Sequence, residues 1–318
     1  MIKPRGFKDR IFIFYFAVAG RNPRRLYENI ENMGLIRNYT RLVKFEHTLF
    51  ALPFAMIGFF MAYLQPGSVV SLKLLVLVLF CMVFARNAAM GFNRWLDRRY
   101  DLRNPRTASR EIPAGVITPK SALLFVIGNA LLFILTTWFI NLLCFFLSPV
   151  ALFVILFYST TKRFTSLSHF FLSLGLAIAP LGAYLAVTSR FDWPPLLLST
   201  IVFLWVSGFD IVYSLQDEEF DKEQKLKSLP ARLGKKRALR LSEVIHGLTA
   251  VLVVLLAITV KGGGLHWAGV LWFCGLLLSQ HLLVKPHDLR RVNLAFFTTN
   301  GMASVAYAGF VIADLLIR

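Results

Sequence analysis

Long apolar runs recur about every thirty residues along this chain of 318 residues. Each run is close to the roughly 20 residues that an α-helix needs to cross the hydrocarbon core of a bilayer. Backbone N–H and C=O groups in lipid must be hydrogen-bonded within the segment, which favours helices. The sequence therefore predicts an all-α fold, a multi-pass membrane helix bundle of about nine transmembrane helices, near residues 47–64, 73–93, 121–140, 142–159, 168–188, 196–215, 241–260, 265–284 and 295–316.

The distribution of basic residues orients this bundle. The chain carries 35 Lys and Arg against 17 Asp and Glu, a net charge of +18 that would also suit nucleic-acid binding. If the segment before the first span is cytoplasmic, the bases fall there and in every second connection, except Lys73, Arg86, Arg190, Lys261 and Arg318. Basic loops on one side are typical of the cytoplasmic face of membrane proteins. We expect an integral protein of a bacterial-type inner membrane, partnered by the lipid bilayer and by no nucleic acid.

A column of oxygen ligands follows the second apolar run. Asn93, Asp97 and Asp101 are spaced at i, i+4 and i+8, so on a helix they lie close to one face. Mg²⁺ prefers one or two carboxylates together with phosphate oxygens and water. Because arginines follow the column, it suits a magnesium ion that holds a phosphate group. Alternatively, these residues form a solvated helix end with i,i+4 ion pairs.

A second acidic column favours the first interpretation. Asp210, Tyr213, Asp217 and Asp221 are spaced at i, i+3, i+7 and i+11, which again places them on one helical face after an apolar run. Six of the 17 acidic residues lie within 210–223. The charge distribution places both columns on the cytoplasmic side, so the sequence predicts that they act together.

The two columns resemble the motifs of the UbiA superfamily of intramembrane aromatic prenyltransferases. The run NPRTASREIPAG at 104–115, and Leu226, Lys227 and Ser228, resemble its 4-hydroxybenzoate polyprenyltransferase branch. The resemblance covers roughly residues 41–316. It implies a transmembrane prenyltransferase domain at 41–318, after an N-terminal cytoplasmic or interfacial extension at 1–40. It also implies a Mg²⁺-dependent enzyme that ionises a polyprenyl diphosphate and transfers the prenyl group to a small aromatic acid in quinone biosynthesis.

This resemblance gives roles to residues of both columns. The catalytic residues would be Asn93, Asp97, Asp101, Asp210, Asp217 and Asp221. All of these except Asp210 would be ligands of Mg²⁺. Tyr213 would contact substrate, and Arg106, Arg110 and Lys227 would donate to the diphosphate oxygens.

Arg86 is the one base inside a predicted span. It precedes Asn93 by two helical turns, and an arginine at membrane depth normally faces a cavity or a partner. We predict that it binds an acidic substrate group, either the carboxylate of the aromatic acceptor or a diphosphate oxygen. A structural pairing with another helix is the alternative.

Cysteine and histidine offer no competing site. The three cysteines, Cys81, Cys144 and Cys274, lie in separate spans, which predicts neither a zinc site nor a disulfide framework. His47 is the only histidine expected near the end of a site-bearing span, and we predict a packing or hydrogen-bonding role for it.

Other functions remain open at this point. A naphthoate acceptor would lead to menaquinone rather than to ubiquinone-type quinones, and the motifs do not separate the two. A transporter also places charges at helix ends, but it binds its cargo near the midplane of the membrane. A non-catalytic membrane scaffold would tolerate neutralisation of Asp97 or Asp217.

Overall fold

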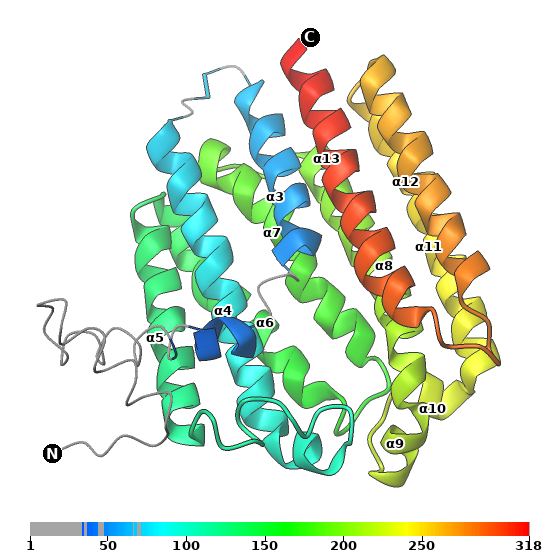
Figure 1. Cartoon of the computed structure of the whole chain (residues 1–318). Coiled ribbons are helices and arrows are strands. Elements are labelled where there is room, and N and C mark those ends of the chain that lie inside the picture. The colour runs from blue at the N-terminus through cyan, green and yellow to red at the C-terminus, as the bar shows by residue number, and fades with distance from the viewer. Residues whose placement is uncertain (1–33, 35–36, 44–47, 66, 69–70, 318) are drawn as a thin grey trace, which may run out of the picture.

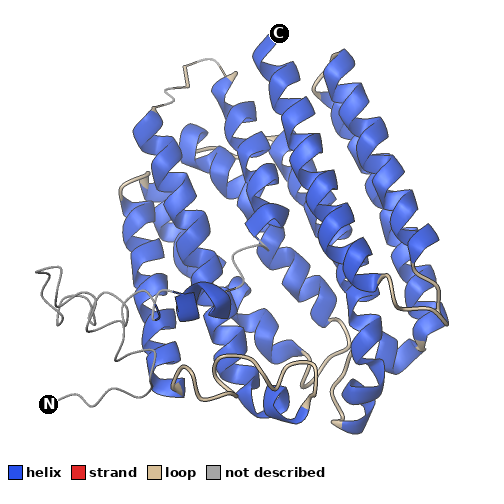
Figure 2. Ribbon diagram, in the orientation of Figure 1, coloured by secondary structure: helices blue, strands red, loops and turns tan. Residues whose placement is uncertain are grey.

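The computed structural model describes residues 34, 37–43, 48–65, 67–68 and 71–317, and these are almost entirely helical (Figures 1 and 2). The predicted extension at 1–40 lies outside the described residues apart from 34 and 37–40. The long helices are α3 (Thr48–Tyr63), α4 (Leu72–Arg103), α5 (Pro119–Trp138), α6 (Leu142–Thr161), α7 (Ser168–Thr188), α8 (Trp193–Ser214), α11 (Lys235–Thr259), α12 (Gly264–Leu283) and α13 (Asn300–Ile317). Shorter elements are the 3-10 turn η2 (Leu215–Asp217), α9 (Glu218–Glu223), α10 (Leu229–Leu233) and the π-helical turn η3 (Leu294–Thr299).

The predicted class, an all-α membrane helix bundle, is confirmed. Seven helical segments of the described chain are long and apolar enough to cross a bilayer. The other two predicted runs are also helical. However, α3 is shorter than these segments, and α12, which carries His266, Gln280 and His281, is not among them. The structure therefore does not confirm the count of nine spans. The three cysteines are free, as expected.

The helices pack around an aromatic core. Helix α3 packs against α7 and α13, while α8 lies between α7 and α11. Between these helices, the Phe54 ring lies 5.0 Å from that of Trp205, and the Phe273 ring lies 5.2 Å from that of Tyr307. Helices α4, α5 and α6 form a second group that contacts the first mainly through α6 and α7. Large apolar side chains on the outside, such as Phe146, remain exposed, as a lipid-facing surface requires.

A polar network inside this core holds the start of α13. The fully buried Asn300 follows the π-helical turn, and its Nδ2 donates to the carbonyls of Ala295 and Phe296 at 3.2 and 3.0 Å. Its Oδ1 accepts from Trp205 Nε1 at 3.1 Å and from Gln280 Nε2 at 2.6 Å. These bonds join α8, α12 and α13 where an unpaired polar group would be costly.

The first column lies on a helix, as its spacing predicts, whereas the backbone expected for the second column is corrected. The predicted span at 73–93 ends at Asn93, and α4 continues to Arg103, so one helix carries all three residues of the first column. The second column does not lie on one continuous helix. Helix α8 ends at Ser214, the 3-10 turn η2 contains Asp217, and Asp221 lies in α9. A 3-10 turn is wound more tightly than an α-helix, so the i, i+7 and i+11 spacing no longer defines one face.

Candidate active site

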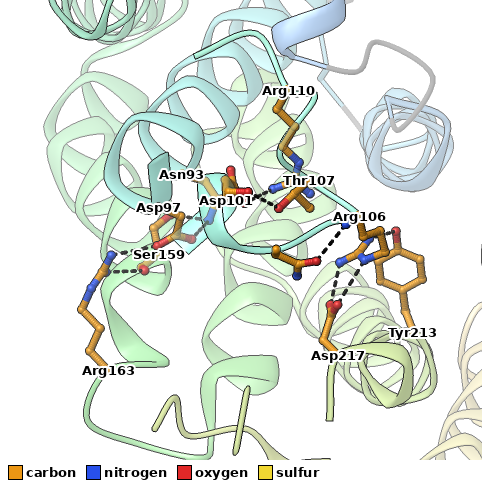
Figure 3. Close-up of polar contacts among 11 residues, drawn as sticks. Asn93, Asp97, Asp101, Arg106, Thr107, Arg110, Ser159, Arg163, Tyr213 and Asp217 are labelled. Carbon is orange, nitrogen blue, oxygen red and sulfur yellow. Dashed lines mark hydrogen bonds and ion pairs between the residues drawn. The ribbon is translucent and has the colours of Figure 1, made fainter. Parts of the chain in front are cut away.

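Both acidic columns lie at one end of the bundle. Helix α4 delivers the first column to the end where the 104–118 connection and the short helices α9 and α10 are found (lower part of Figure 1). Helix α8 arrives at the same end with the second. Figure 3 shows the two groups side by side, with Arg106 of the connection in contact with the second. The two columns therefore lie at the same end of the fold, and their joint action stays a prediction.

Asp97 lies among donors from two helices. Asn93 Nδ2 donates to Asp97 Oδ2 at 3.2 Å, one helical turn along α4. Arg163, which follows α6, donates from Nη2 to Asp97 Oδ1 at 2.8 Å and from Nη1 to the carbonyl of Ser159 at 3.0 Å. The Asp97 carboxylate is thus fixed to α6 as well as to its own helix (Figure 3).

Asp101 is held by the connection that follows α4. Its side chain is buried, and Arg110 Nη1 donates to its Oδ1 at 2.6 Å. The Thr107 hydroxyl donates to the Asp101 carbonyl at 3.1 Å, which folds the connection back over the helix end. The other carboxylate oxygen, Oδ2, is buried and accepts no hydrogen bond from the described residues. Buried acceptors normally have a donor or an ion, so this atom is suited to receive one.

Arg106 is the centre of the second group. Its guanidinium grips Asp217 with two bonds, Nε to Oδ1 at 3.1 Å and Nη2 to Oδ2 at 2.6 Å, and its Nη1 donates to the Tyr213 hydroxyl at 3.2 Å. Burial lowers the pKa of Arg106, but the charge and hydrogen bonds of Asp217 and Tyr213 together raise this pKa overall. Tyr213 is held in turn by Phe296 of the π-helical turn, whose ring stacks on it at 4.0 Å. A bidentate Arg–carboxylate pair of this kind fixes geometry as well as charge.

Lys162 brings a further cation to the aspartates. It caps the C-terminus of α6, and its Nζ lies 3.5 Å from Oδ2 of the buried Asp221. Burial lowers its pKa, but surrounding carboxylates raise it overall. These are Asp221, Asp217, Asp210 and Asp97. The charges of aspartates from both columns therefore act on the pKa of this one side chain.

A histidine that the sequence did not single out lies at the site. The buried His169 of α7 contacts Asp210 with 2.6 Å between Nδ1 and Oδ2, while His47, the histidine expected near the end of a site-bearing span, lies outside the described residues. His169 is the second residue of α7, so the bond joins the start of α7 to the end of α8. Asp210 is therefore oriented toward α7 and has a different partner from the other aspartates.

Two predicted substrate-binding residues do not contact the aspartates. Lys227 Nζ donates to the carbonyl of Phe164, in the α6–α7 connection, at 3.1 Å. Arg86, two turns along α4 from Asn93, donates from Nη2 to the Val43 carbonyl at 3.4 Å and is partly buried. Its contact is with the chain that precedes α3, and its predicted substrate role stays a prediction.

The donor chemistry of the site suits magnesium, although the described residues show no preformed cage. No group of three or more His, Cys, Asp or Glu residues is gathered at metal-binding spacing within the described chain. Each predicted carboxylate ligand instead contacts a cation: Asp97–Arg163, Asp101–Arg110, Asp217–Arg106 and Asp221–Lys162. Oxygen ligands from carboxylate and amide groups, with the unsatisfied Asp101 Oδ2 among them, are the type that Mg²⁺ binds. The ligand set therefore stays a prediction that the chemistry fits.

Sequence reasoning missed three residues of this site: Lys162, Arg163 and His169. The first two are adjacent bases in a short connection on the same predicted side as both columns, and that position was the available signal. In the sequence these two bases indicated only the orientation of the chain in the membrane. Arg163 and Asp97 are 66 residues apart, and no local sequence pattern links them. His169 had no signal beyond its place at a span end.

Comparison with known proteins identifies the family. The model of the UbiA prenyltransferase family matches residues 51–302, well over half of the chain. The 4-hydroxybenzoate octaprenyltransferase of Nitrosospira multiformis is 27% identical over 256 residues, covering 80% of this chain and 88% of that protein. The enzyme of the same name from Aliivibrio fischeri strain MJ11 is 29% identical over 238 residues, covering 73% of this chain and 81% of that one.

Solved structures agree with this assignment. A UbiA homolog from Aeropyrum pernix K1 in its apo form aligns with a TM-score of 0.73 and 25% identity, over 86% of this chain and 98% of that one. A UbiA homolog from Archaeoglobus fulgidus bound to GPP and Mg²⁺ aligns with a TM-score of 0.68 and 20% identity, over 88% and 99%. The fold, the two acidic columns and the family match agree, and this chain belongs to the UbiA prenyltransferase family.

Proposed function

We propose that this chain transfers a polyprenyl group from a polyprenyl diphosphate to a small aromatic acid of the 4-hydroxybenzoate type, as a step of quinone biosynthesis. The observation that carries the proposal is that both acidic columns, with four of their five aspartates beside an Arg or Lys, lie at one end of a membrane helix bundle. The names of the relatives support the acceptor class. The homolog bound to GPP and Mg²⁺ supports a prenyl diphosphate donor and a divalent metal.

The acidic columns would hold magnesium. The proposed ligands are Asn93, Asp97, Asp101, Asp217 and Asp221, with Asp210 as a further catalytic residue. The bound metal would neutralise the diphosphate as it leaves. The cationic side chains that pair with these carboxylates would then also lie close to the diphosphate. We propose that Arg106 and Arg110 donate to its oxygens, assisted by Lys162 and Arg163.

The reaction itself requires little from the protein beyond binding and exclusion of water. The allylic C–O bond of the donor breaks, a ring carbon of the acceptor bonds to the allylic carbon, and the ring loses a proton. The phenolic oxygen of the acceptor activates its own ring, so the chain need not supply a nucleophile. The bundle interior keeps water from the allylic cation. We propose that Arg86 binds the acceptor carboxylate, with Tyr213 beside the substrates.

We further propose that residues 41–318 form the prenyltransferase domain, that the protein resides in a bacterial inner membrane, and that the active-site loops are cytoplasmic. The N-terminal extension at 1–40 is assigned no catalytic role.

The proposal is tested by product mass. Membranes containing the full chain are incubated with a polyprenyl diphosphate and either 4-hydroxybenzoate or a naphthoate acceptor, with Mg²⁺ or with EDTA. We expect the prenylated 4-hydroxybenzoate product only with Mg²⁺. Asp97→Asn and Asp217→Asn should lower its rate by about 100-fold or more, the size of effect seen when a charge-stabilising group is removed.

Asp288→Asn is the matched control, because Asp288 pairs with Arg290 in the connection between α12 and α13, outside both columns. This variant should retain wild-type activity. A product formed only from the naphthoate would reassign the acceptor. Full activity in Asp97→Asn, or in EDTA, would refute the metal–diphosphate assignment.

A further inference from the structure

A hollow lined by several basic residues lies beside the candidate active site. It has a cavity volume of about 470 Å³ and lies between the α6–α7 connection and the segment that runs from α9 into α10. Its charged lining residues are Lys222, Lys225, Lys227 and Arg232. Ser166 and Ser228 add buried hydroxyl-bearing residues, and no Asp or Glu of the described chain lines it. We call this hollow the basic pocket.

The charge of the basic pocket is only partly balanced. Lys222 pairs with Glu218 at 2.6 Å, one helical turn away. Lys227 and Arg232 contact neutral acceptors, the Phe164 carbonyl at 3.1 Å and the Ser166 hydroxyl at 3.2 Å. Lys225 forms no ion pair with any described residue. Three cations therefore surround one cavity without a carboxylate among them, an arrangement that favours an anion with several oxygen acceptors.

The position of the basic pocket indicates where that anion comes from. Helix α6 ends at Thr161 and α7 begins at Ser168, and both are among the candidate membrane spans, so the pocket lies at the level where spans meet the aqueous phase. Phe164 lines it and is 51% exposed. A ligand here would have a phosphate in the hollow and apolar chains alongside the exposed ring. Basic pockets at the cytoplasmic ends of membrane helices suit lipid headgroups.

We propose that the basic pocket binds the phosphate of an anionic phospholipid headgroup. The proposal does not depend on the reaction assigned to the acidic columns. Its structural consequence concerns the α6–α7 connection, since the backbone N–H of Lys227 donates to the Lys162 carbonyl at 2.7 Å. A bound headgroup would therefore steady the segment that carries Lys162 and Arg163.

The variant that tests the pocket is Lys225→Gly/Arg232→Gln. Lys225 has a φ of +54°, in the left-handed region, so glycine there removes a charge without adding backbone strain. Arg232 is exposed, and neither residue belongs to the proposed catalytic machinery. The matched control is Arg237→Gln/Arg240→Gln, which removes two exposed charges from the neighbouring helix α11, outside the pocket.

Lipid binding is measured by native mass spectrometry of the purified full chain in detergent, with phosphatidylglycerol and phosphatidylcholine in equal amounts. The wild type and the control should retain phosphatidylglycerol in preference. In the pocket variant the preference should fall by about 25-fold at low salt, roughly fivefold for each charge lost. The melting temperature without lipid, measured in parallel, should match that of the wild type.

Three results would overturn the proposal. In the first, the wild type shows no preference for the anionic lipid. In the second, the control loses as much preference as the pocket variant, which would show that the preference comes from general surface charge. In the third, inorganic phosphate alone raises the melting temperature of the wild type but not of the pocket variant, while no lipid preference is found. That result would assign the pocket to a free anion.

Discussion

At the scale of single residues, the site is a set of carboxylates whose charge is balanced by cations from elsewhere in the chain. Arg163 pairs with Asp97 from 66 residues away, and Arg106 pairs with Asp217 from 111 residues away. Each of these pairs places a guanidinium within hydrogen-bond distance of a partly buried carboxylate, so opposite charges lie side by side. Under the proposed function, a bound metal and diphosphate would replace these contacts between the carboxylates and their cations.

Arg86→Lys separates the roles open to Arg86. If the guanidinium binds the acceptor carboxylate, lysine keeps the charge but loses the two-pronged geometry, and the KM of the aromatic acceptor should rise about tenfold or more. The KM of the prenyl diphosphate should stay nearly unchanged. Steady-state kinetics with each substrate varied separately gives both values. The control is Arg190→Lys. Arg190 follows the C-terminus of α7 and pairs with Asp192, so this change should alter neither of the two KM values.

Two other outcomes would reject the carboxylate role. A change confined to the KM of the prenyl diphosphate would indicate that Arg86 contacts the leaving diphosphate instead. A lower melting temperature with both KM values intact would make its bond to the Val43 carbonyl structural.

The sequence predicted the aspartates of the site but not their partners, for a physical reason. Residues at i, i+4 and i+8 share a helix face whatever surrounds them, so the first column could be read directly. The pair of Arg163 and Asp97, or of His169 and Asp210, depends on which helices become neighbours. That choice is made by packing across the whole bundle. Lys227 shows the converse, because a base close to a motif in sequence points into a different pocket.

At the scale of helices, the bundle depends on close approaches that small residues permit. Helices α3 and α7 approach each other closely at Pro180 of α7. A Cβ on Gly58 of α3 would lie 2.1 Å from the Pro180 carbonyl oxygen of α7. The sequence did not identify Gly58 as the residue that Pro180 contacts, since Gly58 lies within a long apolar run. Interhelical contacts of this kind use small side chains because backbones must approach.

Gly58→Ala should therefore destabilise the protein. The new methyl meets backbone rather than a flexible side chain, so α3 and α7 must separate, at a cost of about 1–3 kcal/mol in the free energy of unfolding. The melting temperature in detergent is the measurement. Gly247→Ala is the control, since a Cβ there meets nothing within 4 Å, and it should leave stability unchanged or higher by up to about 1 kcal/mol. Equal melting temperatures for Gly58→Ala and the wild type would show that α3 and α7 are not held this tightly.

The two columns differ at this scale as well. A continuous α4 carries the first, so its spacing survives into the structure. The second passes through η2 and α9, where local hydrogen bonding overrides the periodicity of the sequence. Helical spacing predicted which residues are catalytic candidates, but it did not predict the break that separates Asp217 from Tyr213.

At the scale of the whole molecule, charge and fold give one orientation. Both columns, the basic pocket and the connection between α12 and α13 lie at the end of the bundle that carries most of the bases outside the N-terminal segment. The C-terminus of α13 lies at the other end (Figure 1). A diphosphate reaches such a site from water, so we expect the basic end to face the cytoplasm, where both basic loops and soluble substrates are found.

Reporter fusions test this orientation. A reporter joined after Lys120, at the start of α5, or after Lys236, at the start of α11, should be read as cytoplasmic, because both positions lie at the end that carries the aspartates. A fusion after Lys261, which follows α11 at the far end, should be read as external. The three fusions together require that α11 crosses the membrane and that the basic end lies inside. If Lys120 and Lys236 are external and Lys261 is internal, the bundle is inverted. The proposed cytoplasmic site would then be wrong, although the fold and the pairing of its residues would stand.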